Sequence, residues 1–212
     1  MLMRLNLPNI ISWLRIFIVP FFFYLLVWGG KGSVELACIL YFFASASDFF
    51  DGWLARKYEE VSNFGKFLDP LADKVLTTAA FFAFVLMGIV ELWMVLIIVA
   101  RDFGTTFLRI YLENRGRSFK TSLAAKWKTT FQMFFIALLL LLLHLQETKE
   151  FTEKILGTTA DSIKQWLYSD TIYYAMLAIT VVSVWTGIEY FFLKEDEKIV
   201  AEDKSCDATR SL

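Results

Sequence analysis

Six long apolar stretches, separated by short polar segments, limit what this chain can fold into more than any other feature. Charged residues make up only 20% of the chain and hydrophobic residues 57%, which is too apolar for a soluble fold of 212 residues. A helix rises about 1.5 Å per residue, so each stretch is long enough to cross a hydrocarbon core of about 30 Å. We therefore expect an all-α, polytopic integral membrane protein with six transmembrane helices around a polar site that faces the cytoplasm. The expected spans are 9–28, 34–57, 65–88, 91–114, 126–144 and 170–193.

The polar segments complete the expected organisation. Residues 1–193 would form one transmembrane domain, and the charged residues 194–212 a flexible tail. Residues 146–169 alternate apolar and charged positions, which is typical of an amphipathic helix lying on the membrane face opposite the polar site.

Four aspartates lie in two pairs around the connection between the second and third stretches. Asp48 and Asp51 are spaced i, i+3, and Asp69 and Asp73 are spaced i, i+4, so on helices each pair shares one face. Four acids beside a membrane core repel one another and lose hydration, so a cation must offset that cost or some of them must be protonated. Oxygen ligands suit Mg²⁺ or Mn²⁺, which complete their shells with water and substrate phosphates. Taken alone, the first pair also fits a structural ion site or a proton relay.

Small and basic residues accompany the acids. Gly52 follows Asp51 directly and Ala55 lies one turn further, so the backbone could approach a flat or phosphate-bearing ligand closely. Arg56 adds a planar fork of donors that suits phosphate.

Further cations lie in the fourth and fifth stretches. Arg101, Asp102 and Arg109 are charges within an apolar span, and such charges are functional candidates. Because Arg101 and Asp102 are adjacent, we expect them to point in different directions rather than to pair. The start of the fifth stretch adds cations and a hydroxyl where free helix N–H groups also favour anions. Arg109, Lys128 and Thr129 are therefore predicted to form a phosphate pocket.

The distribution of basic residues predicts the orientation. The loops next to the aspartates and between the fourth and fifth stretches are rich in Lys and Arg, whereas the opposite loops carry few. Cytoplasmic loops carry this excess in membrane proteins, so the aspartates and both termini should be cytoplasmic. We expect the bacterial inner membrane as the location.

The pattern D-x2-D-G-x2-A-R-x8-G-x3-D-x3-D, which begins at Asp48 and ends at Asp73, resembles the defining motif of the CDP-alcohol phosphotransferase family at every specified position. The resemblance implies a CDP-linked lipid as donor, CMP as leaving group, and a homodimer. It also implies two divalent ions, Mg²⁺ or Mn²⁺, held by Asp48, Asp51, Asp69 and Asp73, with Asp73 as the general base. The residues implied to contact the CDP moiety are Asp48, Gly52, Ala55 and Arg56.

Regions outside the motif are similar to the branch of this family that makes phosphatidylglycerophosphate. The start of the chain resembles its pattern N-x-P-N-x-L-T-x-x-R, with Ser12 in place of Thr and Ile11 in place of Leu. Arg15 in this pattern either snorkels to the headgroups or joins a polar edge with Asn9 and Ser12 that lines the site. The runs 100–109 and 126–129 and the final Gly-Ile-Glu-Tyr also resemble this branch, although Asp102 stands where Glu is usual.

This second resemblance implies sn-glycerol 3-phosphate as the acceptor and CDP-diacylglycerol as the donor. The implied donor contacts then include Asn9 and Ser12, and the acceptor phosphate would lie among Arg109, Lys126, Lys128 and Thr129. Membrane lipid is a further expected partner, and nucleic acid is not.

Several alternatives remain open. The acceptor could instead be inositol phosphate, serine or a second phospholipid. From another class, an acidic metal site could belong to a cation transporter, which would leave Gly52, Ala55 and Arg56 unexplained. Aspartate-rich prenyl-diphosphate enzymes are a further alternative, but their acids usually form a tighter cluster in a soluble helical bundle.

Overall fold

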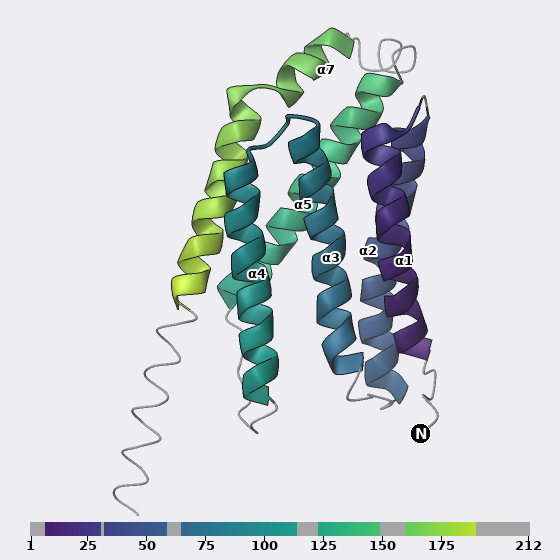
Figure 1. The fold of residues 1–212 in the computed structure, drawn as a ribbon, viewed down its shortest axis with the longest axis vertical. Coiled ribbons are helices and arrows are strands. Elements are labelled where there is room, and N and C mark those ends of the chain that lie inside the picture. The colour runs from purple at the N-terminus through teal and green to yellow at the C-terminus, as the bar shows by residue number, and fades with distance from the viewer. Residues whose placement is uncertain (1–6, 31, 59–64, 114–122, 149–159, 190–212) are drawn as a thin grey trace, which may run out of the picture.

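The computed structural model describes residues 7–30, 32–58, 65–113, 123–148 and 160–189, and these ranges form helices and turns without any strand (Figure 1). The expected all-α class is therefore confirmed for this part of the chain. A last helix over residues 170–189, here called the terminal helix, lies beside α4 in Figure 1. The other helices are α1 (Leu7–Trp28), α2 (Ser33–Tyr58), α3 (Gly65–Leu86), α4 (Leu92–Glu113), α5 (Leu123–Glu147) and α7 (Ala160–Leu167).

The long helices run alternately up and down, so their ends collect at two opposite ends of the bundle (Figure 1). At one end α1 and α3 begin and α2 and α4 finish; we call this the motif end. At the other, far end lie the α1–α2 and α3–α4 turns, the last turn of α5, and α7, which lies across the bundle. Short connections between successive long helices produce this antiparallel order.

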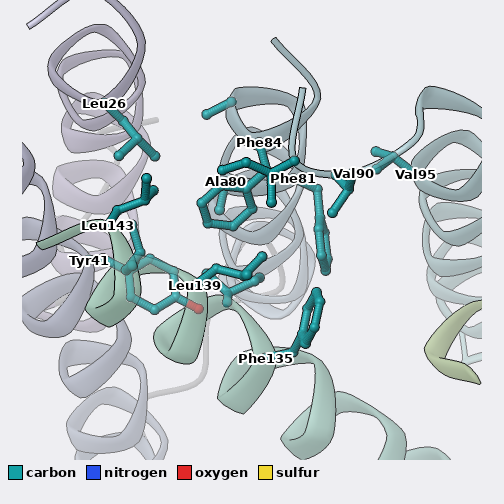
Figure 2. Close-up of a cluster of buried hydrophobic side chains, with 14 of the residues drawn as sticks. Leu26, Tyr41, Ala80, Phe81, Phe84, Val90, Val95, Phe135, Leu139 and Leu143 are labelled. Atoms are coloured by element: carbon teal, nitrogen blue, oxygen red, sulfur yellow. The ribbon is translucent and has the colours of Figure 1, made fainter. Parts of the chain in front are cut away.

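The central helix is α3, which contacts α1, α2, α4 and α5. Its buried residues combine the small side chains of Ala72, Ala80 and Ala83 with the rings of Phe81 and Phe84. In a membrane, lipid is as apolar as leucine, so close packing rather than the hydrophobic effect holds helices together, and alanines allow that close approach. Figure 2 shows the resulting cluster, in which α3 aromatics lie near side chains of α2 and α5 such as Tyr41, Phe135, Leu139 and Leu143.

Glycines shape two turns at the far end. Gly88 ends α3 with a φ of 71°, and its N–H donates to the carbonyl of Val85 while Ile89 N–H donates to the carbonyl of Phe84. This is the Schellman arrangement, which requires a left-handed residue just after the helix and is completed by burial of Ile89. Gly32, with a φ of 84°, makes the turn before α2, as the cluster of glycines at 29–32 predicts.

Two long-range hydrogen bonds connect elements at the far end. The Gly32 N–H donates to Oε1 of Glu147 at 2.6 Å, which joins the start of α2 to the end of α5. The Tyr168 hydroxyl donates to the carbonyl of Met87 at 3.1 Å, which joins the segment after α7 to the α3–α4 turn. The far end is therefore held together by polar contacts between segments distant in sequence.

The predicted amphipathic connection is confirmed over α7. Ile163 and Leu167 are buried on one side of this helix, and Trp166 is exposed on another. Residues 149–159 of the connection and the charged tail lie outside the described ranges.

Exposed Trp and Tyr side chains lie toward both ends of the described helices. Those toward the far end include Trp28, Trp93, Trp166, Tyr168, Tyr173 and Tyr174, and Trp13, Tyr111, Trp127 and Trp185 lie in the motif-end halves of their helices. Trp and Tyr are enriched near the headgroups of membrane proteins because their rings are amphipathic. The other exposed apolar side chains are largely Phe, Leu, Ile and Val, as expected for contact with lipid.

Length and composition agree with a membrane protein. In the described part of the chain, the segments Trp127–Glu147 and Asp161–Glu189 are long and apolar enough to cross a membrane. Shorter apolar segments occur at Trp13–Trp28, Ser33–Ser47 and Lys74–Leu86. The remaining long helix, α4, carries internal charges.

Candidate active site

The two halves of the aspartate motif lie at the same end of the molecule. Asp48 and Asp51 fall in the second half of α2, and Asp69 and Asp73 fall in the first turns of α3. These helices contact each other, and α1 packs against both. The backbone therefore brings the four predicted metal ligands to one side of the bundle, as the sequence predicts, while their side chains and the connector 59–64 lie outside the described residues.

The predicted CDP contacts fall on the same helices. Gly52, Ala55 and Arg56 lie in the last turns of α2, and Asn9 and Ser12 lie in the first turns of α1. Their side chains also lie outside the described part of the structure, so these assignments remain predictions.

The donor chemistry at this end fits divalent cations. The motif supplies four carboxylates from two contacting helices, and oxygen donors of this kind suit Mg²⁺ or Mn²⁺. Elsewhere, among the side chains that the structure does describe, no group of three or more His, Cys, Asp or Glu could hold a metal.

Arg15 on α1 is buried, with only 2% of its surface exposed. The interpretation in which this side chain snorkels to the headgroups is therefore wrong. A guanidinium inside a helical bundle requires polar or charged surroundings, because an isolated buried charge is too costly. Arg15 therefore lies inside the helical bundle rather than at its surface.

A second polar group, which we call the buried charge cluster, links α4, α5 and the terminal helix. It comprises three charged residues, Arg101, Asp102 and Lys128, and the hydroxyl of Thr186. Oδ1 of Asp102 accepts hydrogen bonds from Lys128 Nζ and, at 3.1 Å, from Arg101 Nη1. The second terminal nitrogen of Arg101 donates to Thr186 Oγ1 at 2.8 Å. Asp102 is 4% exposed and Lys128 is 2% exposed, so this pair lies inside the bundle.

The expectation that Arg101 and Asp102 do not pair is wrong. Neighbouring Cα–Cβ bonds do diverge on a helix, but the arginine side chain is long enough for its guanidinium to curl back to the next carboxylate. The terminal helix packs closely on this arginine, since a Cβ added at Gly187 would lie 3.0 Å from Arg101 Cγ. Glycine at this position leaves room for the Arg101 side chain.

The structure describes the side chains of two residues of the predicted phosphate pocket, Lys128 and Thr129. Lys128 is bound to Asp102, and Thr129 beside it is half-buried. Arg109 lies in the last turns of α4 and Lys126 in the first turn of α5, both toward the motif end, and their side chains lie outside the described residues. The ion pair of Asp102 and Lys128 links α4 to α5 through two side chains, while the backbones of these helices do not come into contact in the described part of the chain.

The sequence did not lead us to predict two further buried polar residues, Gln132 and Ser183, which we call, together with the buried charge cluster, the polar seam. Gln132 lies one turn beyond Lys128 on α5, and Ser183 lies one turn before Thr186 on the terminal helix; both are buried. Within the described chain, Gln132 Oε1, Ser183 Oγ and Arg101 Nε have no hydrogen-bond partner. Two patterns in the apolar spans could have indicated these residues. One is the i, i+4 spacing of Lys128 and Gln132, and the other is the three-residue spacing of Thr180, Ser183 and Thr186.

An apolar groove of about 630 Å³ lies between α2 and α5. From α2 it is lined by residues between Cys38 and Ala46, directly before the first motif aspartate, and from α5 by residues between Thr130 and His144. Cys38 Sγ donates to the carbonyl of Leu140 at 3.5 Å and joins the two walls. The groove therefore extends from the level of the motif toward the far end.

Comparison with known proteins agrees with this arrangement. The family model described as CDP-alcohol phosphatidyltransferase matches residues 5–185. A CDP-diacylglycerol–glycerol-3-phosphate 3-phosphatidyltransferase of Bacillus subtilis (strain 168) is 36% identical, over 88% of this chain and 93% of that protein. The proteins of the same name from Rickettsia typhi and Rickettsia prowazekii are each 38% identical, over 88% of this chain and 95% and 93% of theirs. The chain therefore belongs to the CDP-alcohol phosphatidyltransferase family, a family of membrane enzymes.

Proposed function

We propose that this protein transfers the phosphatidyl group of CDP-diacylglycerol to sn-glycerol 3-phosphate, giving phosphatidylglycerophosphate and CMP. The observation that supports it most strongly is that the complete family motif lies at one end of two contacting helices, beside a bundle interior that carries buried cations. The names of relatives that match this chain over most of its length support the same acceptor.

The motif residues would divide the chemistry among them. Asp48, Asp51, Asp69 and Asp73 would hold two divalent ions, which neutralise charge on the diphosphate and on the attacking and leaving oxygens when bound. Asp73 would take the proton from the acceptor hydroxyl. The hydroxyl oxygen forms a new bond to the phosphorus that carries diacylglycerol, and the bond from that phosphorus to the CMP oxygen breaks. Gly52, Ala55 and Arg56, with Asn9 and Ser12, would position the CDP moiety.

Charge is the property of the site that favours this acceptor. Glycerol 3-phosphate carries a dianionic phosphate, which needs cationic partners with directed donors. Arg109 lies in the last turns of α4, and Lys126, Lys128 and Thr129 lie in the first turns of α5, where Lys128 is linked to α4 through Asp102. A neutral or zwitterionic alcohol such as serine would not need this concentration of cations.

The apolar groove favours a lipid as the donor. The groove between α2 and α5 is almost entirely apolar and begins beside the motif segment of α2. A diacylglycerol chain attached to a diphosphate at the motif would therefore find an apolar path along the bundle. Binding sites for lipids are mostly apolar with a few polar groups that fix orientation, which matches this combination.

The proposed setting is the bacterial inner membrane, crossed six times by α1 to α5 and the terminal helix, with the motif end in the cytoplasm. The basic residues next to the motif, set against the few basic residues of the opposite polar segments, support this orientation. CDP-diacylglycerol would enter from the bilayer, whereas glycerol 3-phosphate is water-soluble and would enter from the cytoplasm. A homodimer, implied by family resemblance, can be tested by crosslinking in membranes.

The test of the function is CMP release by the purified full-length protein in detergent with CDP-diacylglycerol. We expect release only when both sn-glycerol 3-phosphate and Mg²⁺ or Mn²⁺ are present, and loss of release when a chelator removes the metal. Inositol phosphate, serine and phosphatidylglycerol serve as alternative acceptors in parallel reactions.

Release with one of these other alcohols alone would contradict the proposed acceptor while preserving the family chemistry. Absence of release with every alcohol, together with metal flux into liposomes that contain the protein, would instead support a transporter.

A further inference from the structure

The buried charge cluster contains more positive than negative charge. Lys128 and Arg101 both donate to the single carboxylate of Asp102, which leaves one formal positive charge among the three. Lys74 of α3, the residue after Asp73, also interacts electrostatically with Asp102 and Lys128. A surplus of positive charge this deep in a membrane bundle favours the binding of an anion.

A contribution to folding stability alone does not explain why these charged residues are buried. A buried ion pair loses hydration that its Coulomb attraction often fails to repay, and well-packed apolar residues of similar volume usually stabilise as much or more. The core residues of α3 and α5 are largely alanine, leucine and phenylalanine, so apolar side chains could have packed at the positions of the cluster as well. Arg101 also retains a buried Nε donor without a partner in the described chain.

We propose that Asp102 is a positioning residue for the acceptor: its carboxylate fixes Lys128 and Arg101 so that Lys128 meets the phosphate of sn-glycerol 3-phosphate. One oxygen, Oδ1, receives both cations, so the position of Asp102 on α4 determines the place of the ammonium group on α5. The link from Arg101 to Thr186 holds the same guanidinium to the terminal helix, so three helices share one electrostatic centre. This inference rests on the proposed acceptor, to which it adds a residue that does not itself touch substrate.

The test uses Asp102→Asn, which keeps the shape of the side chain and removes its charge. Without the carboxylate, Lys128 loses the partner that stabilises its ammonium form and fixes its position. We expect the KM for glycerol 3-phosphate to rise about tenfold or more, while kcat and the KM for CDP-diacylglycerol stay within about twofold. Asp102→Glu, which restores the charge, should bring the acceptor KM back to within about threefold of the wild type.

Ser183→Ala is the matched control, because Ser183 is buried in the same seam and its hydroxyl has no partner among the described residues. It should leave both KM values unchanged. If Asp102→Asn instead lowers kcat and changes both KM values in parallel, with no recovery in Asp102→Glu, the residue is merely structural and the proposal is wrong. A lower acceptor KM in Asp102→Asn would also overturn it.

A binding measurement separates this proposal from the proposed function. Glycerol 3-phosphate at millimolar concentration should raise the Tm of the wild type and of Ser183→Ala, and should raise that of Asp102→Asn much less, because a ligand stabilises only the folded state that binds it. If the wild type releases no CMP but shows this difference in Tm, the inference holds and the function fails. If glycerol 3-phosphate stabilises the wild type and Asp102→Asn equally, the inference fails whatever the activity.

Discussion

Asp73 is the residue on which the proposed chemistry depends most directly, since it would both hold metal and accept the proton. Asp73→Asn keeps the size of the side chain and removes its basicity. A positioned general base contributes about 10²–10⁴-fold to a rate, so we expect the rate of CMP release to fall at least 100-fold. The assay is release from CDP-diacylglycerol at saturating glycerol 3-phosphate.

Asp161→Asn is the control for that variant, because Asp161 is an exposed acid on α7 at the far end. It should retain wild-type activity, and both variants should elute from size exclusion like the wild type. Activity of Asp73→Asn within about twofold of the wild type would remove Asp73 as the base.

At the residue scale, the spacing of charged residues in the sequence predicts the positions of the motif aspartates well. It does not predict which charged side chains form ion pairs. The motif spacing places four acids at one end of α2 and α3, and their backbone positions agree. The contacts from Asp102 to Lys128 and from Arg101 to Thr186 join positions 26 and 85 residues apart, so they depend on helix packing that no local pattern contains. The reach of a long side chain also overrides the direction of its Cα–Cβ bond, as Arg101 shows.

At the element scale, the helix boundaries were largely predictable because apolar runs, glycines and charges mark them. Gly65 begins α3 and the Gly-rich turn precedes α2, both as the sequence indicates. The groove between α2 and α5 was not predictable, because it is produced by the relative placement of helices that are separated by two others along the chain.

This groove leads to a prediction about lipid recognition. Ala137 of α5 lines the groove, and Ala137→Phe would place a ring where an acyl chain is proposed to lie. We expect the KM for a long-chain CDP-diacylglycerol to rise about fivefold or more, and that for a short-chain analogue to change little. The KM for glycerol 3-phosphate should be unaffected.

Leu138→Phe is the matched control, since Leu138 is the next residue on α5, is exposed and does not line the groove. Equal effects of both substitutions, or equal effects on long and short chains, would mean that the groove does not hold the acyl chain.

At the scale of the whole molecule, the distribution of basic residues predicts an orientation in the membrane. Cysteine labelling can measure it in a variant that lacks Cys38 and Cys206. In intact bacterial cells, a membrane-impermeant maleimide should label Thr148→Cys, next to the end of α5 at the far end, and should not label Ser118→Cys, in the basic sequence that follows α4. Permeabilised cells should label both. The reverse pattern would place the motif end outside the cytoplasm.

The exposed aromatics of α4 also predict how the protein responds to its host membrane. Trp93 and Tyr111 lie near opposite ends of this helix, and the helical rise between them is about 27 Å, close to the hydrocarbon thickness of an ordinary bilayer of about 30 Å. A bilayer with a thicker hydrocarbon region would have to thin locally, or the helices would have to change tilt, and either response costs fractions of a kcal/mol per Å. We therefore expect that lengthening the lipid tails would strain the protein that helps to make the lipids around it.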